Sequence, residues 1–214
     1  MSEREESALR EAICAVCRKL WERGLVAGGD GNVSARLGPD RVLATPAGFS
    51  KVDVAPDDLV VVSGDGRKLN GEHAVSTEIG VHLRAYLRRP DVHAVVHAHP
   101  PTATGLAATG QTIPDDVFPE ATVLLGPVPL VRYATPGTPA LADAFEEHWS
   151  GHDAFLMANH GALTLGGSLR VAHQRMESLE HTARILAAAR AFGSVQSLAP
   201  HEVLALREMR ARLH

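Results

Sequence analysis

The stretch VVHAHPP, residues 95–101, places two histidines one residue apart at the end of an apolar run, just before two prolines. Such a run predicts a buried β-strand, which we expect over residues 92–99. Successive side chains of a strand point to opposite faces, so His97 and His99 share one face. Their Cα atoms are then roughly 6–7 Å apart, a spacing at which two imidazoles can converge on one cation. Two structural histidines would produce the same pattern. Only further candidate ligands elsewhere in the sequence can distinguish a metal site from that alternative.

Strand and helix patterns alternate on both sides of this run. Short strands with tight glycine turns precede it, which favours antiparallel pairing over βαβ units. We expect a single domain over residues 1–214 with an α/β fold, in which helices cover a largely antiparallel central sheet. The expected strands are 33–37, 41–46, 58–63, 68–69, 92–99, 128–131, 154–159 and 162–165, and the expected helices are 3–24, 77–87, 101–109, 140–149, 168–191 and 201–213.

Composition excludes several classes of protein. The formal net charge of −4, with acidic and basic residues interspersed, argues against nucleic acid as a partner. No stretch approaches the roughly 18–20 apolar residues that a bilayer span needs, and the polar N-terminus MSEREESALR is no signal peptide. We therefore expect a soluble, cytoplasmic protein with no membrane partner. Cys14 and Cys17 lie in a helical pattern and are expected to be structural.

Two further residues can complete a metal site. The chain has 12 histidines, and His160, in MANHGAL, ends an apolar strand next to a glycine, where side chains become accessible. Three histidines from two strands suit a catalytic zinc, which keeps one coordination position open for substrate. Glu78, in AVSTEIGVH, falls in the first turn of a predicted helix and is either a fourth ligand or a plain capping carboxylate. His82, one turn further, is expected to pack or to face solvent.

Three segments offer an anion-binding site. GGDGN, residues 28–32, supplies clustered backbone N–H groups and the amide of Asn32. TPAG, residues 45–48, is a second glycine turn, and Ser76 with Thr77 places two hydroxyls at a helix N-terminus. Each segment alone is an ordinary turn or cap, but beside a histidine trio they describe a site for a phosphorylated substrate.

In this order the motifs resemble the class II aldolase family. They are GDGNVSAR, TPAG, VSTE, HAHP, PVPLVRYATPGT and NHG, and the match runs from about residue 5 to residue 190. The family includes L-fuculose-1-phosphate and rhamnulose-1-phosphate aldolases, ribulose-5-phosphate 4-epimerases, methylthioribulose-1-phosphate dehydratases and the non-enzymatic adducin head domain. The ordered motifs are diagnostic of the family and much less so of the reaction.

The resemblance implies a set of site residues. The implied zinc ligands are His97, His99, His160 and Glu78. The implied phosphate contacts come from Asn32, Gly48, Ser76 and Thr77, with the backbone of Gly29 nearby. Cobalt, manganese or iron would suit three imidazoles as well as zinc does. The implied fold is a three-layer αβα sandwich, assembled as a homotetramer with its sites at subunit interfaces.

The implied reaction is aldol cleavage. Zinc would hold a substrate carbonyl and a neighbouring hydroxyl, and breaking the adjacent C–C bond would leave a metal-stabilised enediolate. Glu78, displaced from zinc by the substrate, would move the proton at the nucleophilic carbon. The family's epimerases carry aspartate at this position. We therefore expect an aldolase that cleaves a small, fuculose-1-phosphate-like ketose 1-phosphate to dihydroxyacetone phosphate and an aldehyde.

The chain lacks the family's proton-donating tyrosines. Phe118 stands where fuculose-type aldolases carry one, the C-terminal REMRARLH has none, and Tyr133 is expected to pack. Glu120, in VFPEAT, lies close to the place of a catalytic glutamate in related dehydratases; it is either a substitute acid/base or a surface loop residue. The alternatives are thus a lyase of the dehydratase or decarboxylase type, then an epimerase, and last a non-catalytic adducin-like module.

Two departures from the family pattern concern the anion. Asp30 stands where a small hydroxyl residue is usual, and its charge would repel a phosphate if it pointed inward. Ala47 replaces a hydroxyl residue that binds phosphate in fuculose-type enzymes. The expected substrate is therefore either a sugar phosphate or a sugar acid.

Overall fold

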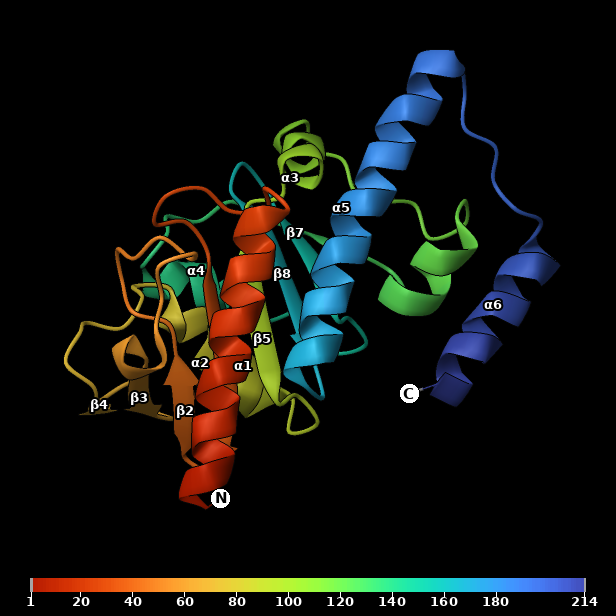
Figure 1. Ribbon diagram of the computed structural model, residues 1–214. Coiled ribbons are helices and arrows are strands. Elements are labelled where there is room, and N and C mark those ends of the chain that lie inside the picture. Colours follow the sequence, from red (N-terminus) through yellow and green to blue (C-terminus); the bar gives the residue numbers. More distant parts are fainter. Residues whose placement is uncertain (1, 214) are drawn as a thin grey trace.

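The computed structural model describes residues 2–213 and places eight strands in one sheet (Figure 1). Their order is β4-β3-β2-β1-β5-β8-β7-β6. Neighbouring strands pair antiparallel, except that β6 joins β7 in parallel, so the predicted largely antiparallel sheet is confirmed. The strands are β1 (Asn32–Gly38), β2 (Arg41–Ala44), β3 (Val60–Ser63), β4 (Lys68–Asn70), β5 (Ala94–Ala98), β6 (Leu130–Val131), β7 (Ala154–Met157) and β8 (Gly161–Gly166).

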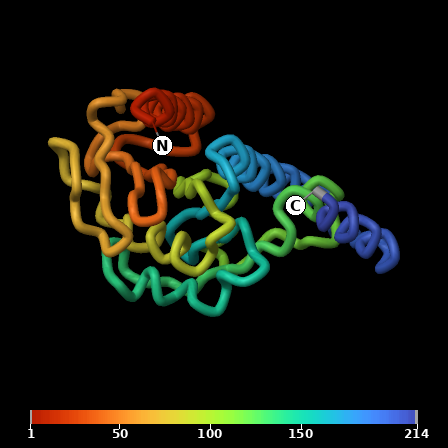
Figure 2. The backbone as a smooth tube through the Cα atoms, turned by 90° about the horizontal axis from the view of Figure 1, so that it is seen from below, coloured from red at the N-terminus to blue at the C-terminus, as the bar shows by residue number. Residues whose placement is uncertain are grey.

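Two helical layers cover the sheet, and the expected three-layer αβα sandwich is confirmed. Buried apolar residues of one face pack against α1 (Glu3–Glu22), α3 (Pro101–Ala108) and α5 (Leu169–Phe192). Those of the other face pack against α2 (Ile79–Arg88) and α4 (Pro139–Asp143). Figure 2 shows this arrangement from below, with α1 and α5 along one side of the molecule.

Several boundaries differ from those expected. The helix expected over residues 77–87 begins at Ile79, because the backbone of Glu78 (φ −94°, ψ 7°) lies outside the helical region. The helix expected over residues 140–149 ends at Asp143 and continues as turns. The strand expected over residues 128–131 keeps only Leu130–Val131. Two short helical turns were not expected, η1 (Pro56–Asp58) and the π-helical η2 (Ala121–Leu125).

Strand β5 distributes its side chains between the two layers. Val96 packs in the core beneath α1, α3 and α5, whereas Val95 packs in the core on the α2 side. Alternation along the strand therefore places His97 on the face that α2 covers. Backbone pairing puts His97 opposite Asn32 of β1 and Leu163 of β8. Residues from several segments can thus meet at the end of β5.

Helix α6 (Pro200–Leu213) packs against η2, on the far side of α5 from α1 (Figure 1). Arg207 donates a hydrogen bond to Asp115 at 2.8 Å, and Arg210 donates one to Asp153 at 2.7 Å.

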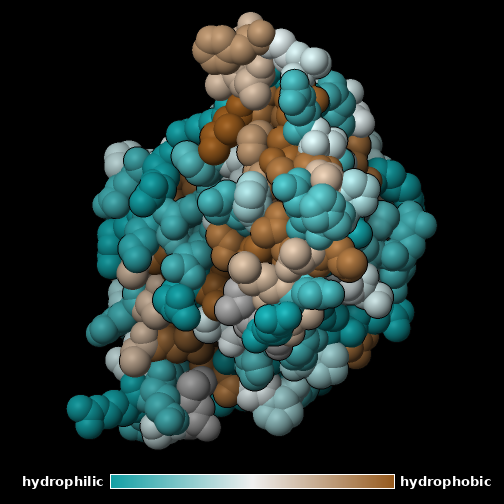
Figure 3. All heavy atoms as spheres, turned by 90° about the vertical axis from the view of Figure 1, so that its right-hand side faces the viewer, coloured by the Kyte–Doolittle hydropathy of each residue, from teal (hydrophilic) through white to brown (hydrophobic). Residues whose placement is uncertain are grey.

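None of the helices in residues 2–213 is long and apolar enough to cross a membrane. On this side of the molecule apolar side chains lie among polar ones (Figure 3), and the large exposed ones on these elements are Leu124, Ile185, Phe192, Leu204 and Met209.

Candidate active site

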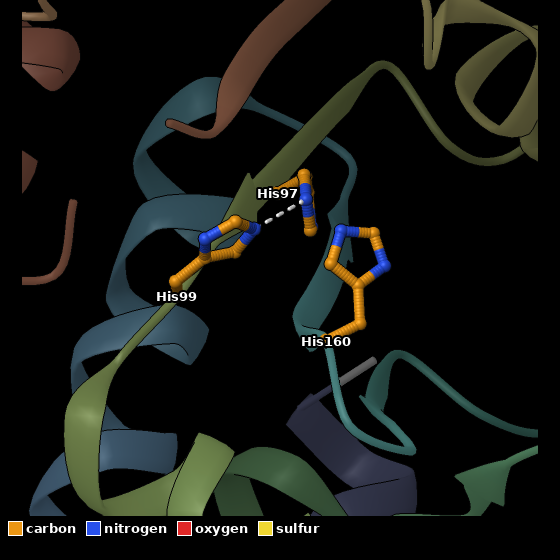
Figure 4. A group of neighbouring side chains, drawn as sticks. All are labelled: His97, His99 and His160. Atoms are coloured by element: carbon orange, nitrogen blue, oxygen red, sulfur yellow. Dashed lines mark hydrogen bonds between the residues drawn. The ribbon is translucent and has the colours of Figure 1, made fainter. Parts of the chain in front are cut away.

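Three histidine rings converge where β5 ends and β8 begins. His97 belongs to β5, His99 follows that strand, and His160 immediately precedes β8. One ring nitrogen from each lies within 4.8 Å of the others, and the ring centroids are 4.9–5.1 Å apart. Figure 4 shows the three rings grouped around a common point. The structure therefore brings together the histidines that strand parity and motif order predicted.

Glycines allow this close approach. A Cβ atom at Gly161 would lie 2.6 Å from both the Ala98 carbonyl oxygen and the His99 ring. A Cβ atom at Gly31, where φ is +69°, would lie 2.7 Å from the His97 carbonyl oxygen. Both distances are shorter than any van der Waals contact, so a larger residue at either position would displace the histidines. Close packing against the histidine segments thus explains why the GN and HG pairs of the sequence motifs contain glycine.

The carboxylate of Glu78 bridges two of the rings. Its Oε2 lies 2.9 Å from His97 Nε2, and its Oε1 lies 3.2 Å from His160 Nε2. Asn32 donates to the same carboxylate from Nδ2 at 3.2 Å. Glu78 is the residue before α2 and makes no side-chain capping bond, so the capping interpretation is wrong. Burial opposes its ionisation, but His160 and His97 more than offset this and lower the pKa of Glu78, which is therefore a carboxylate.

The hydrogen bonds of the cluster show a shortage of donors. His97 Nδ1 lies 2.9 Å from the Ala162 carbonyl oxygen, which can only accept, so the proton of a neutral ring is on Nδ1. His97 Nε2 then carries a lone pair, yet it faces a Glu78 oxygen at 2.9 Å and His99 Nε2 at 3.2 Å. His160 Nδ1 is buried and has no hydrogen-bond partner among the described residues. Neutral rings that converge in this way could share a cation, and imidazole with carboxylate is a ligand set that divalent transition metals bind.

A cavity of about 330 Å³ adjoins the rings. Its lining includes Asp30, Gly31, Pro46, Ala47 and Pro136. The structure thus gathers the predicted anion-binding residues beside the predicted ligands, while His97 is buried behind them with 2% of its surface exposed. The predicted residues that line the cavity are Gly29, Asn32, Gly48, Ser76, Thr77, Glu78, His99 and His160.

Glu120 is not part of this cavity within one chain. It is exposed and immediately precedes η2, which packs against α5 and α6. Phe118 packs against the apolar core under α5. Tyr133 is 56% exposed, so the packing role expected for it is wrong within the single chain. The structure does not bring Glu120 together with Glu78, because the two residues belong to different sides of the sheet's helical covering.

Two charged residues have contacts that the sequence patterns did not indicate. Asp30, whose charge was expected to repel a phosphate if it pointed inward, lines the cavity, and its Oδ2 lies 3.3 Å from His99 Nδ1. Lys51 is buried and donates hydrogen bonds to the carbonyl oxygens of Phe49 at 2.8 Å and Gly29 at 3.3 Å. Desolvation lowers the pKa of Lys51. Lysine is almost never fully buried, so no local pattern pointed to it.

His82 has the packing role expected for it. Its Nδ1 lies 2.7 Å from Ser34 Oγ, which also lies 2.8 Å from the Tyr86 hydroxyl. Complete burial lowers the pKa of His82 to about 3, so the ring is neutral at physiological pH. This polar group joins α2 to β1 directly behind the histidine cluster.

Comparison with known proteins gives the family. Residues 11–187, most of the chain, match the pattern described as Class II Aldolase and Adducin N-terminal domain. The chain is 35% identical over 185 residues to the 3-oxo-tetronate 4-phosphate decarboxylase of Escherichia coli (strain K12), covering 85% of this chain and 87% of that one. It is 33% identical over 196 residues to the 5-deoxy-D-ribulose 1-phosphate aldolase of Bacillus thuringiensis serovar kurstaki, covering 91% of each. A solved L-fuculose 1-phosphate aldolase superimposes with a TM-score of 0.86 at 29% identity, covering 97% of this chain and 96% of that one.

The chain therefore belongs to the class II aldolase family. The predictions of this family and of an enzyme of the lyase class are confirmed, because the relatives are aldolases and decarboxylases. The narrower prediction of a fuculose-1-phosphate-like aldolase stays a prediction, since both reactions occur among these relatives.

Proposed function

We propose that this protein is a metal-dependent lyase that decarboxylates a phosphorylated 3-oxo sugar acid. The observation that carries the proposal is the acid/base content of the cavity. Glu78 contacts the histidine cluster, hydroxyl and glycine residues also line the cavity, and no tyrosine is among the lining residues in the described chain. The 35% identical decarboxylase supports the same reading.

Three imidazoles and one carboxylate would hold the metal: His97, His99, His160 and Glu78. When bound, a divalent cation supplies a Lewis acid for the oxygen of the substrate's 3-oxo group. Zinc is our choice, and cobalt, manganese and iron share its preference for such donors. An imidazole must be neutral to bind a metal. Burial and the neighbouring His97 lower the pKa of His99, which favours its neutral form, although Asp30 has the opposite effect.

The glycine turns and hydroxyl groups of the cavity wall suit a phosphate. Gly48 has a φ of +77°, and a Cβ atom at Gly29 would lie 3.6 Å from the Gly48 backbone. Ser76 and Thr77 add hydroxyls, and a Cβ atom at Gly137 would lie 3.2 Å from the Thr77 side chain, so the TPGT loop holds Thr77 in place. Backbone N–H groups and hydroxyls of this kind bind phosphate oxygens.

Decarboxylation needs fewer acid/base groups in the cavity than retro-aldol cleavage does. When the C1–C2 bond breaks, carbon dioxide leaves and the bonding electron pair stays on C2, which then needs one proton. Glu78, positioned by Asn32, can pass that proton from solvent. Retro-aldol cleavage needs in addition a base for the hydroxyl that becomes the aldehyde, and Glu120 does not reach the cavity of its own chain. Aldol cleavage of a 5-deoxyribulose 1-phosphate-like ketose is the second candidate, because the 33% identical aldolase shares the fold family.

Product analysis separates the two reactions. Both yield dihydroxyacetone phosphate, but only decarboxylation of 3-oxo-tetronate 4-phosphate releases carbon dioxide, and only aldol cleavage releases an aldehyde. The metal-loaded protein should release carbon dioxide and, in deuterium oxide, place one deuterium on the carbon that carried the carboxylate, as read by mass spectrometry. Aldehyde from 5-deoxyribulose 1-phosphate or fuculose 1-phosphate, without carbon dioxide from the sugar acid, would establish the aldolase instead.

We further propose that the chain forms a homotetramer with its sites at subunit interfaces. Exposed apolar residues on α5 and α6 support this, among them Phe192 at 93%, Leu204 at 58% and Met209 at 51% exposure (Figure 3). Light scattering on the purified protein measures the assembly, and a monomer at micromolar concentration would overturn this proposal.

A further inference from the structure

Asp30 lies in a glycine-rich loop whose geometry is closely determined. The loop joins the end of α1 to β1, with Gly28 at φ +52° and Gly31 at φ +69°, and the Asp30 amide donates to the Ala27 carbonyl at 3.0 Å. The resulting turn points the Asp30 carboxylate at His99, whose Nδ1 is 3.3 Å from Oδ2. Asp30 also lines the cavity beside the histidines.

Hydrogen bonds to the backbone hold the segments that carry this pair. Lys51 donates to the Gly29 carbonyl from beneath the loop, at 3.3 Å, and its position is set by a second bond to Phe49 at 2.8 Å. Gly31 is pressed against the His97 carbonyl on the other side of Asp30. The His99 amide donates to the Leu25 carbonyl at 2.9 Å, so the histidine is tied to the same segment. The fold thus fixes the backbone of both residues, while the Asp30 side chain, 47% exposed, reaches His99 from the edge of the cavity.

The contact decides which nitrogen of His99 faces the cluster. A carboxylate accepts only, so it draws the proton of a neutral ring to Nδ1. His99 Nε2 then presents its lone pair toward His97 Nε2, 3.2 Å away. The Ala162 carbonyl has the same effect on His97, at 2.9 Å from its Nδ1. A charged carboxylate in this position also makes the imidazole a stronger ligand than a neutral acceptor would.

We propose that Asp30 is a positioning residue of the metal site, which orients His99 and strengthens its binding to a divalent cation. The inference rests on the metal site of the proposed function but not on which reaction that site catalyses. A small hydroxyl residue in place of Asp30 would not supply the negative charge.

The test measures metal affinity, independently of turnover. Asp30→Ser introduces a small hydroxyl residue without charge, Asp30→Asn removes the charge and keeps an acceptor, and Asp57→Asn is a control at an exposed carboxylate of η1. Metal-free proteins compete with a chromophoric chelator for Zn²⁺, and Co²⁺-loaded proteins give the visible spectrum of the site. We expect Asp30→Ser to weaken Zn²⁺ binding about 10- to 100-fold and to alter the Co²⁺ spectrum. Asp30→Asn should fall between it and the wild type, and Asp57→Asn should match the wild type.

The possible outcomes separate the two proposals. Unchanged Zn²⁺ affinity and an unchanged Co²⁺ spectrum in a folded Asp30→Ser protein would overturn the role of Asp30 and leave the metal site standing. A wild-type protein that does not compete for Zn²⁺ or Co²⁺ would overturn both the metal site and the role of Asp30. Metal binding that depends on Asp30, in a protein releasing no carbon dioxide from the sugar acid, would support Asp30 and reject only the proposed reaction.

Discussion

The polar cluster around Asp153 and the histidine cluster with Glu78 differ in the kind of hydrogen bonding that they make. At Asp153, just before β7, one carboxylate meets three guanidinium groups: Arg89 at 2.9 Å, Arg175 at 2.8 Å and Arg210 at 2.7 Å. Every one of these contacts joins a donor to an acceptor. At the histidine cluster, lone pairs face a carboxylate and one another. Complementary charges stabilise a fold, whereas converging acceptors cost free energy until a cation joins them.

The Asp153 cluster explains how distant elements are held together. Its arginines come from the segment after α2, from α5 and from α6, so one carboxylate joins three elements. Arg210 also donates to the Val123 carbonyl of η2 at 3.1 Å. The cluster thus sets where α6 and η2 pack, and through η2 it places Glu120 on the surface. We therefore expect mutations in the histidine cluster to reduce mainly activity, and mutation of Asp153 to reduce mainly the stability of the fold.

The largest effect on activity is expected for His97→Ala. This change removes the buried ligand that contacts both Glu78 and His99, so metal and activity should be lost together, with kcat/KM falling by about a thousandfold or more. Elemental analysis and a turnover assay measure the two losses. His93→Ala, at an exposed histidine one residue before β5, is the control and should retain both. A full equivalent of metal in the His97→Ala protein would contradict the site.

Glu78→Gln should separate metal binding from turnover. The three histidines remain and keep the metal, but the amide cannot carry the proton, so kcat should fall by roughly 10²- to 10⁴-fold. Glu72→Gln, at an exposed glutamate in the loop before α2, is the matched control. Turnover close to that of the wild type in the Glu78→Gln protein would reject the acid/base role.

Asp153→Asn should have the smallest effect on activity and a large effect on stability. Removing the charge leaves the arginines without their shared counterion, which we expect to lower the free energy of unfolding by roughly 3–5 kcal/mol in urea titrations. Asp143→Asn breaks an exposed pair with Arg84 and should cost less than about 1 kcal/mol. Metal content and kcat of the folded Asp153→Asn protein should stay near those of the wild type. Equal free energies of unfolding for Asp153→Asn and Asp143→Asn would contradict the proposed stabilising role of the Asp153 cluster.

The site was predictable wherever a local rule determined it. Strand alternation placed His97 and His99 on one face, and a glycine after His160 indicated an accessible strand end. The prediction for Glu120 rested on motif position alone, and the fold puts that residue on the surface near α6. Glu78 was ambiguous between cap and ligand until α2 was found to start at Ile79.

The sequence by itself indicated the family, the largely antiparallel sheet and the four residues now proposed as metal ligands, because periodicity within a strand and the order of short motifs can be read without knowing the packing. Only the tertiary structure decided that Asp30 faces His99, that Lys51 is buried beneath the Gly29 loop, and that Glu120 is remote from Glu78 within one chain. These facts depend on distances between segments far apart in the sequence. Such distances follow from how helices and loops pack on the sheet, which no short stretch of residues specifies.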